Sequence, residues 1–523
     1  MKINKNYKNQ YFLLSILLIS LLSSFLRGYA LFQTDFANGW DGYFYLVQMQ
    51  SLAETGNAHT GDASIIYWYL TGFYFLFQDY VVAYKVGIAV LVGIFTFLAI
   101  LLTKKYSTKK IALFVGVLIL CSPHLTYFVS QYPKNLLGIV SLILFWLIFP
   151  KMEKIPFAFE NDIVLSVAKA NTQGLIYQII LLVFVLILNY VSHKLTFFIA
   201  LLWLGVFFLA KINQIKLIFI GISILFIISF LRIDLTEYWS QWRRIHDALG
   251  GFSFVPYQFW ESFGSERISV FWRIEIIVSI LVVICSLFTL LFYKNKITLF
   301  YKVTVISLSF LLLPVLKWDL EGISFRLFML FGVLWVVLIP VLQLQTLSFF
   351  KTLRVLDSLF FLLIMLSFFS SQSYKPILHD PTNQTYKSVT DNFEKQSNEL
   401  ESKVKLLILH KSFAEYFTFR TEIDALPWLP EPALKEEISD ENLYRLATHI
   451  RKEEFEYYLK DTLRNENKVK RLGLNYFLLK ETDYQKMLKK AEQENDTLLI
   501  ERMTNHNYNP SRVRPLFLLE QKK

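Results

Sequence analysis

The stretch Tyr80–Leu102, YVVAYKVGIAVLVGIFTFLAILL, decides the class of this protein. Among its 23 residues it contains one charged side chain, Lys85. A helix of about 20 apolar residues is long enough to cross the hydrocarbon core of a bilayer. The stretch therefore predicts a transmembrane helix. Lys85 lies near its start, and we expect it to reach the interface or to pair with Asp79.

Comparable apolar runs recur from residue 11 to about residue 371. Of the 523 residues, 54% are hydrophobic and 18% are charged, whereas about a quarter of the residues of a soluble protein are charged. No small-residue cleavage site follows the first run, so we expect it to be a retained helix and not a signal peptide. The sequence predicts an α-helical polytopic membrane protein with about eleven spans, at residues 11–31, 80–102, 111–129, 136–150, 175–191, 195–210, 217–231, 274–293, 299–316, 327–345 and 354–371.

The net charge of +11 is distributed unevenly. Residues 372–523 contain 25 basic and 25 acidic residues, so the whole excess lies in residues 1–371. Of the 28 basic residues there, 17 fall in short loops on one predicted side, with 4 acidic residues. This is the positive-inside bias of membrane proteins, and it places the N-terminus in the cytoplasm. The basic charge therefore indicates orientation in the cytoplasmic membrane and not binding of nucleic acid.

The predicted domains follow from composition. Residues 1–371 form the transmembrane module, with long outer loops at 32–79 and 232–272. The second loop contains Trp239, Trp242, Trp260 and Trp272, which are expected to form an interfacial belt. Residues 372–402 are polar and are predicted to be a linker.

Residues 403–523 are predicted to form a small soluble α/β domain, which lies on the extracytoplasmic side of the membrane because the number of spans is odd. Short apolar runs at 403–410, 474–479 and 515–519 are typical of buried strands. Glu441–Ile450 and Glu453–Leu463 have helical spacing.

The first outer loop contains the most informative acids. Residues 34–46 read TDFANGWDGYFYL and lead into a predicted helix along the membrane surface. A hydroxyl that attacks an anomeric carbon must lose its proton, and a nearby carboxylate can accept it. Asp41 is the candidate base, and Asp35 is its substitute or a partner that binds an acceptor or a metal. The alternative is that Asp41 only caps the helix.

Three cations and one histidine are placed to bind an anion on the outer side. Lys134 lies in a short turn between two spans, and Lys317 and Arg326 bracket another outer loop. Such groups can hold a departing phosphate, although they can also reach the interface without any ligand. His193, at the outer edge of two spans, is a further candidate for lining the site.

Together with Asp35 and Asp41, the run Phe325-Arg326-Leu327-Phe328 resembles the GT-C superfamily of multi-spanning glycosyltransferases. These enzymes take sugar from a polyprenyl-phosphate carrier. The resemblance implies a GT-C-like fold, a general base in the first outer loop and a carrier phosphate bound by Arg326. The sequence departs from the paired acids of the protein mannosyltransferase and aminoarabinose transferase branches, because Gly42 follows Asp41.

The expected function is transfer of a sugar from a polyprenyl-phosphate-linked donor to a lipid, glycan or protein acceptor. No Gly-rich phosphate loop or Cys/His metal spacing is present, and Cys121 and Cys285 both lie in apolar runs. No cofactor is indicated, apart from a possible divalent cation. The alternatives are a flippase or transporter of lipid-linked oligosaccharide, and a polysaccharide polymerase or ligase. The small number of charges inside the spans and the absence of a repeat favour the enzyme over the transporter.

The charge asymmetry predicts the topology directly. A reporter fused at Lys105 should give a cytoplasmic signal, and the same reporter fused at Lys403 should give an outside signal. Cytoplasmic signals from both fusions would contradict the topology and remove the active site from the outer face.

Overall fold

The computed structural model divides the chain into two compact units. The first contains Met1–Gln33 and Ile88–Ile377, and the second contains Thr34–Gly87 and Leu378–Lys523. The described residues are 5–39, 41–59, 64–149, 172–211, 270–292, 297–312, 322–346, 387, 390–391, 407–408, 411–421, 425–426, 476–480, 489, 492–493, 497, 507–510 and 516–520.

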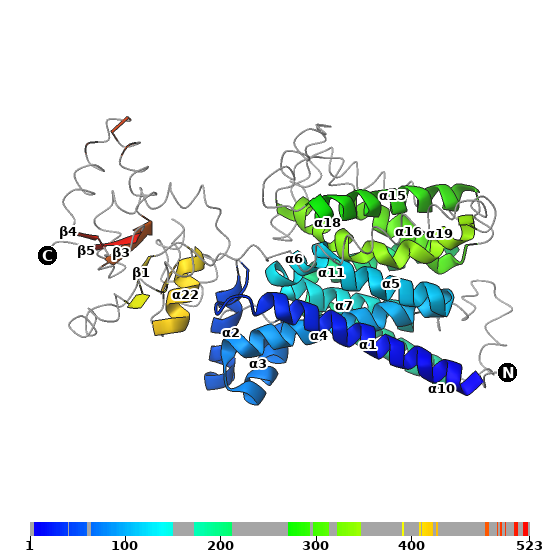
Figure 1. Ribbon diagram of the computed structural model, residues 1–523, viewed down its shortest axis with the longest axis horizontal. Coiled ribbons are helices and arrows are strands. Elements are labelled where there is room, and N and C mark those ends of the chain that lie inside the picture. The colour runs from blue at the N-terminus through cyan, green and yellow to red at the C-terminus, as the bar shows by residue number, and fades with distance from the viewer. Residues whose placement is uncertain are drawn as a thin grey trace. The chain divides into compact units, whose positions relative to one another are not determined.

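Within these residues, three helices are long and apolar enough to cross a membrane (Figure 1). They are α1 (Lys5–Leu31), α4 (Tyr80–Tyr106) and α15 (Val270–Phe292). Two further helices, α5 (Lys109–Cys121) and α6 (Pro123–Gln131), form a fourth candidate span that is bent by 59°. The prediction of a helical protein with several helices long and apolar enough to span a membrane is confirmed.

The other predicted spans are represented in part by shorter helices. The segments at 217–231 and 354–371 lie outside the described residues, so the number of eleven spans stays a prediction. The shorter elements of the first unit are α7 (Pro133–Ile148), α10 (Thr172–Ser192), α11 (Lys194–Lys211), α16 (Leu299–Leu311), α18 (Gly322–Leu334), the 3₁₀ helix η1 (Trp335–Leu338) and α19 (Ile339–Thr346).

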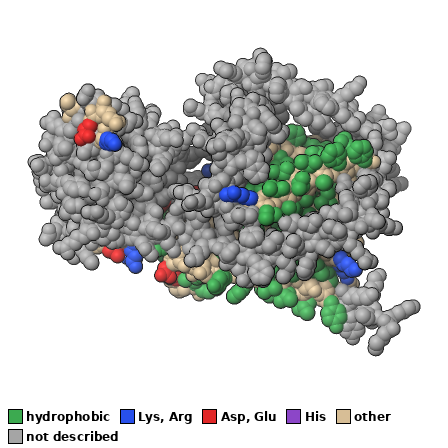
Figure 2. All heavy atoms as spheres, turned by 45° about the horizontal axis from the view of Figure 1, so that its top comes forward, with side chains coloured by type: hydrophobic (Ala, Val, Ile, Leu, Met, Phe, Trp, Pro, Cys, Tyr) green, Lys and Arg blue, Asp and Glu red, His purple; other side chains and the backbone are tan. Residues whose placement is uncertain are grey.

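Apolar side chains lie on the outside of the helices as well as between them. Figure 2 shows hydrophobic side chains gathered over a broad surface. On α15, the exposed large hydrophobic residues are Ile277, Leu281, Ile284, Phe288, Leu291 and Phe292, whose spacing places them on one helix face. Soluble proteins rarely expose apolar patches of this extent. The face is suited to contact with lipid.

Close packing in the first unit depends on glycine at one helix crossing. Helix α7 packs against α10 and α11. A Cβ atom added at Gly138 of α7 would lie 2.4 Å from Thr196 Oγ1 and 2.7 Å from the His193 Cβ. The helices can therefore approach this closely only because residue 138 has no side chain.

The second unit is built around α2 (Gly42–Thr55), the helix predicted after Asp41. It ends at Gly56, which has a φ of 76° and donates its N–H to the Leu52 carbonyl. Helix α2 packs against α3 (Ile65–Phe77) and α22 (Lys411–Thr421). The Tyr43 ring of α2 contacts Tyr416 edge-on, with 4.7 Å between ring centroids. Eight of the 14 residues of α2 are buried, so most of the helix is covered by protein.

A five-stranded sheet also belongs to the second unit. Its strand order is β2-β1-β3-β5-β4; β1 pairs in parallel with β2 and β3, and β5 pairs antiparallel with β3 and β4. Strands β1, β3 and β5 overlap the three predicted strand segments. The two predicted helices lie outside the described residues, so the α/β character of this domain stays a prediction. The strands are β1 (Leu407–Ile408), β2 (Ala425–Leu426), β3 (Tyr476–Lys480), β4 (Asn507–Pro510) and β5 (Leu516–Glu520).

The crossing at Gly138 gives a stability prediction. Gly138→Ala should destabilise the protein by about 1–3 kcal/mol, because the added methyl group overpacks the contact with His193 and Thr196. Gly205→Ala in α11 is the matched control, since nothing lies within 4 Å of the added Cβ. That variant should be neutral or more stable, because alanine favours helix over glycine. Thermal unfolding in detergent measures both, and equal midpoints would contradict the packing argument.

Candidate functional site

Asp41 occupies the N-cap position of α2 but does not cap it with its side chain. Its φ and ψ are −106° and 13°, and its carboxylate makes no capping hydrogen bond. The carboxylate is partly buried and interacts electrostatically with Tyr84. Its backbone carbonyl accepts a hydrogen bond from the Tyr45 N–H at 3.2 Å. Asp35, six residues earlier, is exposed. The alternative in which capping alone explains the Asp41 carboxylate is therefore not supported.

The loop that carries both acids is anchored by two buried side chains of α4. Lys85 is 1% exposed and donates from Nζ to the Thr34 carbonyl. The Tyr84 hydroxyl donates to the Asn38 carbonyl at 3.1 Å. Asp79 accepts the Val82 N–H at 2.8 Å and so caps α4. Lys85 thus points inward to the acidic loop and does not reach the interface.

Aromatic rings pack together where this loop joins α2. Tyr45 of α2 lies 5.7 Å from Tyr67 of α3 and 5.8 Å from Tyr84, measured between ring centroids. All three rings are buried. Such clusters are rigid because each ring is packed on its neighbours. The packed rings therefore form a rigid support for the N-terminal end of α2 and for Asp41.

Lys134 lies where a tight outer turn was predicted. Helix α6 ends at Gln131 and α7 begins at Pro133, so a single residue separates the two helices. Proline suits this first helical position because its missing N–H is not needed there. Lys134 follows directly and is partly buried.

His193 connects α10 and α11 and is buried, with 9% of its surface exposed. Its N–H donates to the Asn189 carbonyl at 2.9 Å, and its own carbonyl accepts from Thr196 Oγ1 at 2.8 Å. Its Cβ faces Gly138, which is one helical turn after Lys134 in α7. The structure therefore brings the elements of Lys134 and His193 together.

The structure describes the position of Arg326 but not that of Lys317. Arg326 lies in α18 and is exposed, whereas Phe328 and Met329 next to it are buried. Lys317 lies outside the described residues. The predicted acids belong to the second unit, and Lys134, His193 and Arg326 belong to the first.

A polar network that the sequence analysis missed surrounds the break between α5 and α6. Pro123 has no N–H, so the Ile119 carbonyl loses its regular helical donor. The Arg27 side chain from α1 replaces it, with Nη2 donating to the carbonyls of Ile119 at 2.8 Å and Ser122 at 2.9 Å. Nη1 donates to the Leu120 carbonyl at 2.5 Å. A buried guanidinium thus satisfies the carboxyl end of α5.

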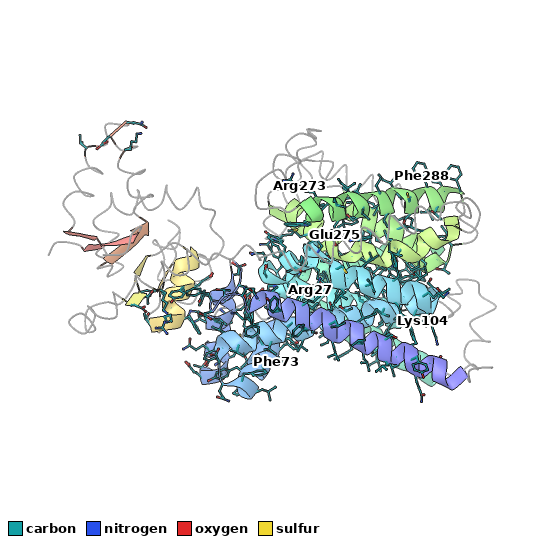
Figure 3. The ribbon with its side chains drawn as sticks, viewed as in Figure 1. Arg27, Phe73, Lys104, Arg273, Glu275 and Phe288 are labelled. Atoms are coloured by element: carbon teal, nitrogen blue, oxygen red, sulfur yellow. The ribbon has the colours of Figure 1, made fainter. Side chains whose placement is uncertain are left out.

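Glu275 from α15 accepts hydrogen bonds at the amino end of α6. Its Oε1 accepts from Ser122 Oγ at 2.5 Å, and its Oε2 accepts from the His124 N–H at 2.9 Å. Ser122 Oγ in turn accepts the Leu125 N–H at 3.0 Å. Figure 3 shows Arg27 on α1 and Glu275 on α15. A cation at a helix C-terminus and an anion at a helix N-terminus both match the helix dipoles.

His124 is fixed in one tautomer by the same network. The Trp272 indole N–H donates to His124 Nδ1 at 2.7 Å, so Nδ1 is an acceptor. Nε2 therefore carries the proton and donates to the Met329 carbonyl at 2.9 Å. Gly332 leaves room for the ring, because a Cβ there would lie 2.3 Å from Nε2. His124 is held as a neutral structural residue.

The network adds two buried charges that the sequence analysis did not consider, and it corrects one prediction. Arg27 and Glu275, near the ends of candidate spans, are 1% and 8% exposed. Trp272 was assigned to the interfacial belt, yet it is 2% exposed and bonded to His124. Ser122-Pro123 inside a predicted span was the available signal, since proline interrupts a helix there. An ionisable residue within a span is also a marker of function.

No protein-family model matches the chain, and no curated protein matches it.

Among the residues with described positions, no group of three or more His, Cys, Asp or Glu side chains is placed to hold a metal. The divalent cation considered for Asp35 stays a prediction.

The network at the break predicts strong coupling between two distant residues. Arg27→Met should cost about 3–5 kcal/mol, because it removes the buried cation that interacts electrostatically with Glu275 and the hydrogen bonds from Arg27 to the carbonyls of Ile119, Leu120 and Ser122. Glu275→Gln should also destabilise, and the double variant should cost less than the two single costs combined. Arg326→Met, at an exposed arginine, is the control and should change stability by about 0.5 kcal/mol or less. Denaturant unfolding in detergent tests this, and additive costs would argue against the coupling.

Proposed function

We propose that this protein is an inverting, GT-C-type glycosyltransferase. It moves a sugar from a polyprenyl-phosphate-linked donor to a lipid, glycan or protein acceptor on the outer face of the cytoplasmic membrane. The observation that carries the proposal is the anchoring of the Asp41 loop by Lys85 and Tyr84 of α4. A general base must be held within hydrogen-bond reach of its substrate, and a loop fixed at two points from a long helix meets that need.

The proposed reaction is a single displacement. Asp41 accepts the proton of the acceptor hydroxyl as the hydroxyl oxygen attacks the anomeric carbon. The bond from this carbon to the carrier-phosphate oxygen breaks, and the phosphate leaves with the electron pair, so the configuration inverts. Lys134, Arg326 and Lys317 are the proposed cations for the departing phosphate. Asp35, which is exposed, is the proposed partner for the acceptor or for a divalent cation.

The geometry of α4 supports an outer location of the Asp41 loop. Helix α4 has 27 residues, which corresponds to about 40 Å of length. Its last turn carries Lys104 and Lys105, the residues expected on the cytoplasmic side. Lys85 and Tyr84, which anchor the loop, lie near the other end. The proposal includes eleven spans, a cytoplasmic N-terminus and an outer domain at residues 403–523.

A second candidate function, a flippase or transporter of lipid-linked oligosaccharide, is favoured by a different observation. Transporters often contain broken helices whose ends interact with charges inside the membrane. The break between α5 and α6, with buried Arg27 and Glu275, has this form. The two functions differ in chemistry, because a transporter moves its lipid-linked sugar without breaking the bond to phosphate.

Asp41→Asn tests the enzyme directly. Asparagine has nearly the same shape and keeps the backbone contact to Tyr45, so folding should be unchanged. A carboxamide cannot accept the proton of the acceptor, and turnover should fall by about 10²–10⁴-fold. The measurement is sugar transfer from a polyprenyl-phosphate donor by purified protein in detergent.

Asp35→Asn is the matched control and should lose less activity. If Asp35→Asn loses the activity and Asp41→Asn keeps it, the roles of the two acids are exchanged. Normal transfer by both variants would reject a carboxylate base in this loop. Absence of transfer by the unmodified protein, together with movement of the intact lipid-linked sugar across vesicles, would favour the transporter.

A further inference from the structure

Asn38 lies in the acidic loop, three residues before Asp41, and its side chain has an unusual environment. The residue is 2% exposed. Its Nδ2 and Oδ1 atoms are both buried and have no hydrogen-bond partner within the described part of the chain. Its backbone carbonyl, by contrast, accepts the Tyr84 hydroxyl at 3.1 Å. The backbone is therefore held in place while the carboxamide is left unsatisfied.

An unsatisfied buried carboxamide is costly. Most buried polar side-chain atoms in proteins have at least one hydrogen-bond partner, and burial without one loses the bonds made with water. An apolar side chain of the same shape would avoid this cost. Asn38 therefore lowers the stability of the unliganded protein unless a bound molecule completes its hydrogen bonds.

The carboxamide has a defined preference for its partner. Its Nδ2 provides two donors and its Oδ1 provides an acceptor, both in one plane. A sugar hydroxyl donates and accepts at the same time and so matches both atoms, whereas an ionised phosphate offers acceptors alone. Gly39 follows Asn38 with a φ of 84°, a backbone conformation that glycine adopts easily. The turn at Gly39 thus belongs to the segment that sets the position of the carboxamide.

We propose that Asn38 is a sugar-binding residue that pairs with a hydroxyl group of the lipid-linked donor. This inference rests on the proposed function and names the part of the substrate that the Asp41 loop recognises. Asn38 binds the transferred sugar next to the base, and the anchoring by Tyr84 fixes its position. The carboxamide is 2% exposed, so side chains that cover it must shift to admit the sugar, while the Tyr84 hydrogen bond holds the Asn38 backbone.

Asn38→Leu and the smaller Asn38→Ala test the proposal. The two probes are polyprenyl phosphate carrying one hexose and polyprenyl phosphate without sugar. Thermal unfolding of the full-length protein in detergent, with and without each probe, measures binding. The unliganded leucine variant should melt at the same temperature as the unmodified protein or higher. Its affinity for the hexose-bearing lipid should fall by about 10- to 100-fold, with the affinity for the bare lipid unchanged.

A matched control is Asn189→Leu in α10. Asn189 is 0% exposed, and its carboxamide also has no partner in the described residues, but it belongs to the other unit. It should keep full discrimination between the two lipids. Undiminished discrimination by both Asn38 variants would overturn the inference and leave the proposed function standing. Unfolding of both Asn38 variants would also overturn it, because the side chain would then be structural. No response of the unmodified protein to either lipid would instead overturn the proposed function.

Discussion

The break between α5 and α6 is the constraint on which the first unit depends. Pro123 removes one helical donor, and the His124 N–H turns away from the Leu120 carbonyl to bond Glu275. Buried groups without partners are costly, so the freed carbonyls need a donor from elsewhere. Arg27 supplies it. Three segments that are distant in sequence, α1, the α5–α6 pair and α15, are thereby fixed against one another by the hydrogen bonds of Arg27 and Glu275 to the two helix ends.

The second unit relies on a different kind of support. Its acidic loop has little secondary structure of its own, and its position is set by two side chains of α4, Lys85 and Tyr84. The rings of Tyr45 and Tyr67 pack beside Tyr84, and α22 covers α2 from another side. A candidate catalytic loop is thus held by a rigid helix and an aromatic cluster, which is the arrangement that precise positioning of a reactive carboxylate needs.

The two sets of buried polar groups have different consequences for function. Arg27, Glu275 and His124 have partners that complete most of their hydrogen bonds, which is the pattern of a structural network. Asn38 leaves both side-chain atoms without a partner in the described residues, as Asn189 does. The proposed sugar contact therefore depends also on the position of Asn38, three residues before Asp41 in the same loop.

Hydropathy and length act locally, so the amino-acid sequence is enough to predict which segments are helical and apolar: α1, α4 and α15 lie where continuous apolar runs predicted spans. It also located α2 after Asp41 and the tight turn before Lys134. Tertiary structure alone decided the partners of Lys85, the burial of Trp272 and the pairing of α5 and α6 with Arg27. Each of these depends on side chains that meet from distant parts of the chain, and a local pattern contains no information about which distant group will satisfy a buried charge or a freed carbonyl.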